Sequence, residues 1–221
     1  QHTASHLANA GHRILYIESV GIRAPKLSSS RDLGRMWRRL KRAWKGPRPV
    51  RKNIWVYSPL AIPFKHHWPM VKWLNQGVLR LLIGWFCRSK YFKQPVVWTY
   101  HPYMLDSLPG NHWGPLVYHC VDDLSVIPGI DCDSYRAAER CLLAKSDVVF
   151  TTSQELLAHC LQVNSNSYFY PNVADIEHFS VAREIGSLPQ EFDNIPEPRI
   201  GYIGVLSDFK VDFQLVSDVA E

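Results

Sequence analysis

Two adjacent carboxylates, Asp122 and Asp123, stand directly after a short apolar run that ends at His119. Carboxyl groups this close raise each other's proton affinity, and one of them can accept a proton from a hydroxyl or orient a histidine. We therefore take Asp122 or Asp123 as the candidate catalytic base. The alternative is that one of the two caps the following turn through its backbone N–H groups, a common use of aspartate.

Polar side chains also follow the neighbouring apolar runs. His101 and Tyr103 come after one run, and His119 closes the next. The His101 imidazole can hydrogen-bond a ligand hydroxyl or a developing phosphate charge, and Tyr103 and His119 place further polar groups at the same strand ends, so these three side chains are candidate ligand-binding groups. The alternative for His101 is a histidine packed under the next loop. Ser153, which is followed by Gln and Glu, is expected to cap a helix.

A glycine turn at Gly201 and Gly204 follows a polar, proline-containing stretch. Glycine allows the backbone to approach a ligand closely, and Lys210, six residues after Gly204, can reach a phosphate as a point charge. The Gly-x-x-Gly pattern is less than a dinucleotide-binding fingerprint, which needs a third glycine and a downstream acid.

The positive charge of the chain is concentrated in one segment. Residues 26–52 carry eleven Lys or Arg and one acid, whereas the whole chain has a net charge of +5. A basic amphipathic helix with tryptophan at its apolar edge suits an anionic membrane surface, although an ordinary surface helix with solvated cations is the alternative. The side chains expected to face the membrane are Arg35, Trp37, Arg38, Arg39, Arg42 and Trp44. We expect no nucleic-acid partner, because no binding module or stacking motif accompanies the charge.

These residues require a scaffold that brings strand ends together. The strands predicted from β-branched and aromatic runs are residues 13–17, 54–57, 96–100, 116–119, 148–152, 167–170 and the start of 199–204. The helices predicted from apolar spacings of three and four are residues 3–10, 70–87, 133–145, 154–161 and 213–220. The alternation predicts an α/β fold with a largely parallel sheet and helices on both faces. Ligands would bind beyond the carboxyl ends of its strands.

The helix predicted over residues 70–87 has one broad apolar face. Its members are Val71, Leu74, Val78, Leu81, Leu82 and Trp85. Lys72 and Arg80 interrupt the pattern, so the helix lacks the ~20 apolar residues that a spanning helix needs. We therefore expect a helix that packs by this face and does not cross a membrane.

Composition shifts divide the chain. We expect one domain over residues 1–180, a proline-containing linker over 181–198 and the start of a second domain over 199–221. The five cysteines are odd in number, and none has the spacing of a zinc or redox pair. We therefore expect reduced thiols in a cytosolic protein and no metal site.

Six stretches, taken in chain order, carry a resemblance to a known family. They are Leu7-Ala-Asn-Ala-Gly-His-Arg-Ile-Leu-Tyr-Ile-Glu18, Trp98-Thr-Tyr-His-Pro102, Val117-Tyr-His-Cys-Val-Asp-Asp123, Ser146-Asp-Val-Val-Phe-Thr-Thr-Ser153, Pro171-Asn-Val-Ala-Asp-Ile-Glu-His-Phe179 and Ile200-Gly-Tyr-Ile-Gly204 with Lys210. The series resembles bacterial family 4-type glycosyltransferases of the GT-B fold, similar to the enzymes of teichuronic acid and exopolysaccharide biosynthesis.

The resemblance implies two facing Rossmann-like domains, the first binding the acceptor and the second, truncated here, binding the nucleotide-sugar. His101, Tyr103 and His119 would then contact the acceptor, while Gly204 and Lys210 would contact the donor phosphates. Enzymes of this type usually need no divalent metal, and we expect no cofactor.

Parts of the family pattern would lie outside the chain. The first strand and its glycine-rich acceptor loop would precede residue 1, and the donor-binding pair of glutamates would follow residue 221. We therefore expect that the chain alone does not catalyse transfer.

The expected function is transfer of a sugar from a nucleotide-sugar donor to a glycan or lipid-linked acceptor in bacterial surface polysaccharide synthesis. The enzyme would be cytoplasmic and peripheral on the inner face of the plasma membrane, with an anionic membrane surface as a partner. The alternative is a non-catalytic Rossmann-like binding or scaffold module, which the missing donor half favours.

Overall fold

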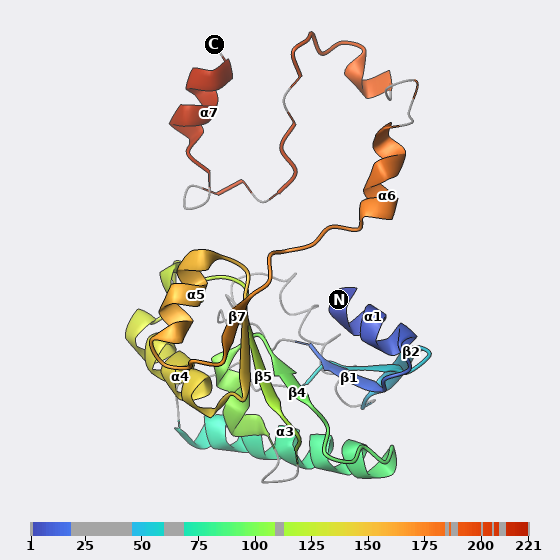
Figure 1. Ribbon diagram of the computed structural model, residues 1–221, viewed down its shortest axis with the longest axis vertical. Coiled ribbons are helices and arrows are strands. Elements are labelled where there is room, and N and C mark those ends of the chain that lie inside the picture. The colour runs from blue at the N-terminus through green and yellow to red at the C-terminus, as the bar shows by residue number, and fades with distance from the viewer. Residues whose placement is uncertain are drawn as a thin grey trace. The chain divides into compact units, whose positions relative to one another are not determined.

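The computed structural model describes residues 2–18, 46–59, 69–108, 113–183, 186, 190–199, 201–204, 206–207 and 211–220. The chain divides into two units, residues 1–170 and residues 171–221 (Figure 1). All strands of the described chain belong to the first unit.

A three-stranded sheet with strand order β1–β3–β2 opens the first unit. Its strands are β1 (Ile14–Ile17), β2 (Arg48–Arg51) and β3 (Ile54–Tyr57), and helix α1 (His2–Asn9) precedes β1. β1 and β3 are parallel, and β2 pairs antiparallel with β3 after a turn in which Asn53 has a φ of 65°. The sequence did not predict β2, because all four side chains of its Arg-Pro-Val-Arg stretch are exposed and show no apolar alternation. Its edge position tolerates the proline.

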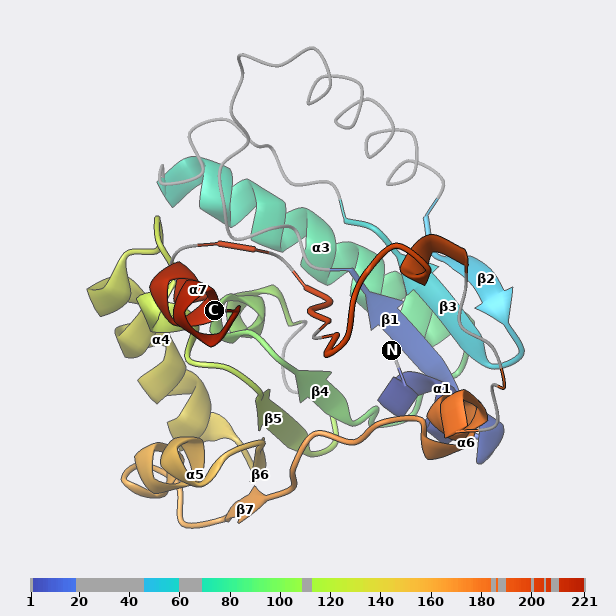
Figure 2. The same ribbon diagram turned by 90° about the horizontal axis from the view of Figure 1, so that it is seen from above.

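A second sheet contains four parallel strands in chain order, β4–β5–β6–β7 (Figure 2). The strands are β4 (Val97–Thr99), β5 (Leu116–Cys120), β6 (Val148–Thr151) and β7 (Ser167–Phe169). Helix α4 (Cys132–Lys145) connects β5 to β6, and α5 (Gln154–Leu161) connects β6 to β7, as parallel pairing requires. Two short 3₁₀ helices, η1 (Pro102–Ser107) and η2 (Leu124–Val126), follow β4 and β5. The structure thus has the predicted α/β architecture with a parallel sheet, consistent with a Rossmann-like domain.

The main core lies between this second sheet and the helices α4 and α5. Tyr118 and Cys120 enter it from β5, two residues apart as the period of a strand requires. Leu142 and Leu143 of α4 meet them, and all four side chains are at most 1% exposed. Because alternate residues of β5 are held in this core, the loop after β5 begins from a fixed position.

Helix α3 (Pro69–Ser89) packs by a face that the sequence did not predict. Among the side chains of α3 that the structure describes, the buried ones are Leu79, Ile83 and Phe86. Three members of the predicted packing face are instead exposed, namely Val78, Leu81 and Trp85. The prediction of the face was wrong because the helix is apolar on most sides, so that spacing alone does not select the side that packs. In the part of the chain that the structure describes, no helix has the length and apolarity to cross a bilayer.

The second unit holds helical elements only, as far as the structure describes it. They are α6 (Ile176–Ser180), η3 (Val181–Arg183), η4 (Gln190–Phe192) and α7 (Phe213–Ala220). Helix α7 has its predicted bounds. Helix α6 begins where the Asp175 carboxylate accepts a 3.0 Å hydrogen bond from the His178 N–H.

The strand predicted from Arg199 is wrong for the residues that the structure describes there, 199 and 201–204. Ile203 is fully exposed, and no other strand of the second unit is described that would pair with this backbone. A strand pattern without a partner does not form a ladder. The predicted domain boundaries at 180 and 198 stay predictions.

Candidate functional site

The carboxyl ends of β4, β5 and β6 lie at one edge of the parallel sheet, and the predicted polar residues follow them. The register pairs Cys120 at the end of β5 with Thr151 at the end of β6. One residue further on, the hydroxyl of Thr152 donates a 2.8 Å hydrogen bond to the carbonyl oxygen of Val121. This bond joins the loops after β5 and β6, directly before the two predicted carboxylates.

Asp123 is a capping residue. Its Oδ1 accepts hydrogen bonds from the backbone N–H and the hydroxyl of Ser125, at 3.0 and 2.5 Å, and its Oδ2 lies 3.6 Å from Nη2 of Arg136. Burial raises the pKa of Asp123, but the Ser125 hydrogen bonds and the Arg136 charge together outweigh it and lower the pKa below its ordinary value. The predicted rise in proton affinity is therefore wrong for Asp123, because its surroundings stabilise the charged form.

Asp122 differs from its neighbour. It is exposed, and it makes no hydrogen bond or ion pair with any residue that the structure describes. The sequence left open whether one of the two aspartates caps the following turn. Asp123 caps η2, and Asp122 keeps both carboxylate oxygens available to a ligand.

His101 begins η1, and its Nδ1 accepts a 3.2 Å hydrogen bond from the N–H of Tyr103. Burial lowers the pKa of His101 and favours the neutral ring, which then carries its proton on Nε2. Nε2 is buried without a hydrogen-bond partner in the described chain. The ring packs near Tyr103 and Tyr135, with centroids 5.0 and 6.3 Å away. His101 is therefore packed under the loop and also retains one unpaired donor.

His119 belongs to an aromatic cluster on the opposite face of the sheet from Tyr118, because successive strand side chains alternate. The centroids of Trp98, Tyr100 and Phe150 lie 5.8, 5.0 and 6.3 Å from its ring. Burial lowers the pKa of His119 as well, and its Nδ1 has no hydrogen-bond partner among the described residues.

The predicted acceptor-binding residues therefore form two groups. His101 and Tyr103 are neighbours on the side of α4, since both rings contact Tyr135 of that helix. His119 stands apart with the rings of the other sheet face. Helix α4 contacts both η1, which begins at His101, and η2, which follows Asp123. Of the two groups, only His101 and Tyr103 therefore lie against the same helix as the loop that carries Asp122.

The sequence reasoning missed Glu139, a carboxylate of α4 that is only 5% exposed. Its Oε1 accepts a 2.6 Å hydrogen bond from the hydroxyl of Tyr118, and its Oε2 lies 3.3 Å from Nε2 of His159 on α5. A signal for it was present, because Glu139 stands four residues after buried Tyr135 and three before buried Leu142. A charged residue in the buried row of a helix indicates a paired polar group.

Acidification should destabilise the fold through His101 and His119. Both pKa values are lowered in the folded state, so the stabilising contribution is present above the unfolded pKa near 6.5 and is lost as the pH falls below it. We expect the urea midpoint to fall between about pH 7 and pH 5.

The matched variant is His101→Asn with His119→Phe, which keeps a capping acceptor and an aromatic ring. Its midpoint should change less over the same pH range. An equal pH dependence in the variant would show that other groups cause the effect.

The remaining predicted residues have separate outcomes. Ser153 is confirmed as a helix cap, because its hydroxyl oxygen accepts a 3.2 Å hydrogen bond from the N–H of Leu156. A Cβ on Gly204 would come within 2.7 Å of the Tyr202 hydroxyl, a contact that a flexible side chain can relieve. Lys210 lies outside the described residues. So do the predicted membrane-facing residues Arg35, Trp37, Arg38, Arg39, Arg42 and Trp44.

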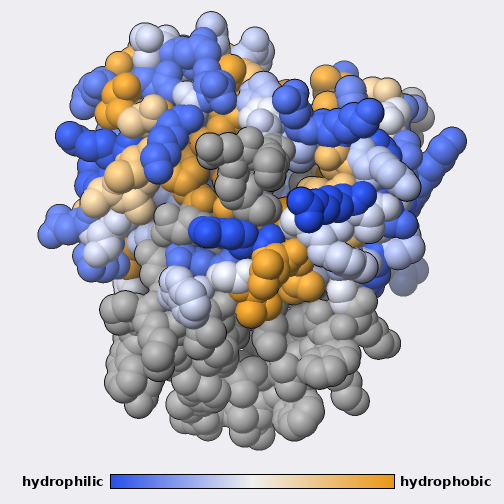
Figure 3. Space-filling model, turned by 90° about the horizontal axis from the view of Figure 1, so that it is seen from below, coloured by the Kyte–Doolittle hydropathy of each residue, from blue (hydrophilic) through white to orange (hydrophobic). Residues whose placement is uncertain are grey.

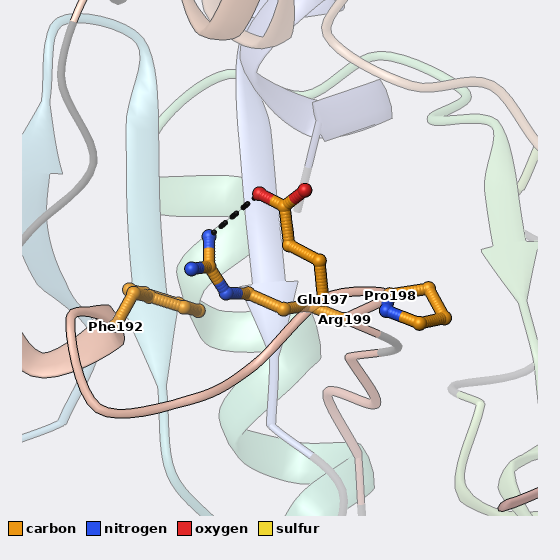
Figure 4. Close-up of a pocket in the computed structure, with 4 residues that line it drawn as sticks. All are labelled: Phe192, Glu197, Pro198 and Arg199. Atoms are coloured by element: carbon orange, nitrogen blue, oxygen red, sulfur yellow. Dashed lines mark ion pairs between the residues drawn. The ribbon is translucent and has the colours of Figure 1, made fainter.

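A hollow of about 350 Å³ in the second unit is a separate feature (Figure 4). Its walls are Phe192, Glu197, Pro198 and Arg199, with Nη1 of Arg199 3.4 Å from Oε1 of Glu197. It contains none of the predicted site residues. Among the residues that the structure describes, no cluster of three or more His, Cys, Asp or Glu is placed to hold a metal ion.

Comparison with known proteins assigns the chain to no family. No model of a protein family matches the chain. No curated protein is significantly similar to it in sequence.

Proposed function

We propose that the protein transfers a sugar from a nucleotide-sugar donor to a glycan or a lipid-linked acceptor, as a glycosyltransferase of bacterial surface polysaccharide synthesis. The observation that carries this proposal is the exposed Asp122, which has no partner among the described residues and follows β5 at the carboxyl edge of a parallel sheet, where His101 follows the neighbouring strand β4. Ligands bind at this edge in open α/β sheets. The series of six sequence stretches supports the same class of enzyme.

In this proposal Asp122 is the general base. Its carboxylate takes the proton of the acceptor hydroxyl while the hydroxyl oxygen forms a bond to the anomeric carbon. The bond from the anomeric carbon to the donor phosphate oxygen breaks, and its electron pair leaves with the diphosphate. His101, whose Nε2 is buried, holds the loop after β4 in position, because its Nδ1 accepts the Tyr103 N–H. The resemblance to glycosyltransferases assigns contacts with the donor phosphates to Gly204 and Lys210.

Asp122→Asn should lower the rate of sugar transfer by at least about a hundredfold, because the amide cannot take up the proton. The assay measures release of the nucleoside diphosphate and extension of the acceptor, with protein expressed from the complete gene. The thermal unfolding midpoint should stay close to that of the unchanged protein, since Asp122 is exposed and unpaired within the described chain.

Asp133→Asn is the matched control, because Asp133 is also exposed but lies in the first turn of α4. Asp123→Ala should act on stability instead, because it removes the acceptor that caps η2. Full transfer by Asp122→Asn would exclude the role of this base. If the unchanged protein neither transfers sugar nor hydrolyses the donor, the second candidate is favoured, a non-catalytic binding or scaffold module in which Asp123 is structural.

The proposed location is the cytoplasmic face of the plasma membrane, with an anionic membrane surface as partner. This location rests on the charge of the segment 26–52.

A further inference from the structure

Helix α3 presents a second apolar surface, distinct from its buried face. We call it the α3 surface and define it by Trp73, Val78, Leu81 and Trp85. Their exposed fractions are 70, 50, 75 and 63%. Trp73, Leu81 and Trp85 are separated by eight and four residues, so they form one row along the helix. Large apolar side chains that are exposed together in a row mark an interaction surface.

The charge around the α3 surface has one sign. Residues 69–94 contain five Lys or Arg and no Asp or Glu. Arg88 is exposed and lies three residues after Trp85, on the same side of the helix. Lys90 and Lys93 are exposed just beyond the C-terminus of α3. A partner for this surface must therefore accept tryptophan and leucine and also carry negative charge.

A lipid bilayer has both properties. Tryptophan prefers the boundary between hydrocarbon and headgroups, leucine enters the acyl region, and Lys and Arg pair with anionic headgroups. Helix α3 has 21 residues and is about 31 Å long at 1.5 Å per residue, so several turns can lie in the membrane plane. Figure 1 places α3 at the lower border of the first unit, and Figure 3, seen from below, shows an apolar patch beside hydrophilic side chains.

We propose that the α3 surface lies in the interface of an anionic membrane, parallel to the bilayer plane. The exposed row enters the headgroup region, while Leu79, Ile83 and Phe86 keep the helix attached to the protein. The inference requires no donor, acceptor or catalytic residue, and it deepens the membrane location proposed above by naming a second contact surface. It also uses residues other than those of the basic segment 26–52.

The experiment measures co-sedimentation of the 221-residue chain with phosphatidylcholine vesicles that contain or lack phosphatidylglycerol. We expect binding to the anionic vesicles only, and a decrease at high salt. Leu81→Ser with Trp85→Ser should lower the partition coefficient by at least about tenfold. The control is Val126→Ser with Leu161→Ser, two residues outside α3 that are 70 and 46% exposed. This control should bind as the unchanged chain does.

A second measurement covers the case in which the serine variant fails to fold. Brominated lipid should quench tryptophan fluorescence in the unchanged chain, and Trp73→Phe with Trp85→Phe should lower that quenching measurably, with Trp37 and Trp44 of the basic segment contributing to the remainder. Equal binding by the serine variant, quenching unaffected by the phenylalanine variant, or binding independent of phosphatidylglycerol would each overturn the proposal. Self-association that is lost in the serine variant while vesicle binding is unchanged would identify a second copy of the chain as the partner, and would also overturn it.

Discussion

Glu139→Ala should lower the free energy of unfolding by about 1 to 3 kcal/mol, because it leaves the buried Tyr118 hydroxyl without its carboxylate acceptor. The Tyr118 hydroxyl is the main cause. Tyr118 is 1% exposed, and it loses its 2.6 Å hydrogen bond to Glu139 when the carboxylate is removed. His159 loses its contact with Oε2 as well, but its partly exposed ring is solvated and adds less. Urea unfolding followed by circular dichroism measures the change.

Two variants separate the hydrogen bond from the helix that carries it. Glu139→Gln keeps an oxygen that accepts from Tyr118, so its cost should be about 1 kcal/mol. Asp133→Ala removes an exposed carboxylate from the first turn of the same helix and should cost about 0.5 kcal/mol. If Glu139→Ala were as mild as Asp133→Ala, water would have to reach the Tyr118 hydroxyl in the variant.

The Glu139 group also supports the candidate site. Tyr135 lies one turn before Glu139 on α4, is fully buried, and contacts the rings of His101 and Tyr103. The position of α4 therefore determines where the loop after β4 places its unpaired imidazole nitrogen. Loss of the Glu139 hydrogen bonds should loosen this edge of the sheet even though no atom of Glu139 takes part in the proposed chemistry.

The elements that sequence reasoning predicted well are those with a strong period and clear ends. Helix α5 starts at the Ser153 cap and has its predicted bounds, and β5 alternates between buried Tyr118 and outward His119. The carboxyl edge that carries the candidate site followed from these elements. The position of this edge could be predicted because the carboxyl ends of parallel strands lie at the same edge of a sheet.

The parts that were not predicted depend on contacts distant in sequence. The packing face of α3 is set by what lies against Leu79 and Ile83, and a helix that is apolar on most sides does not reveal it. The choice of Asp123 as the cap depends on Ser125 and Arg136, because only the three-dimensional structure shows which carboxylate they reach. Glu139 is predictable as a buried charge but not as the partner of Tyr118.

Leu142→Ala should lower the free energy of unfolding by about 3 kcal/mol, since it leaves a cavity in the core between α4 and the parallel sheet. Leu142 is completely buried and belongs to one cluster with Tyr118, Cys120 and Val149, which come from the two central strands. Removing its methyl groups costs transfer free energy and also the contacts that neighbouring atoms cannot recover by relaxation. The loss is measured by urea unfolding at neutral pH.

Leu161→Ala is the matched control, because the same side chain at the end of α5 is 46% exposed. Its cost should stay below about 1 kcal/mol. If the two variants were equally stable, the sheet and α4 would not form a close-packed core, and the fixed geometry of the β5 loop would lose its physical basis. If Leu142→Ala also weakened sugar transfer while Leu161→Ala did not, the position of Asp122 would depend on this core.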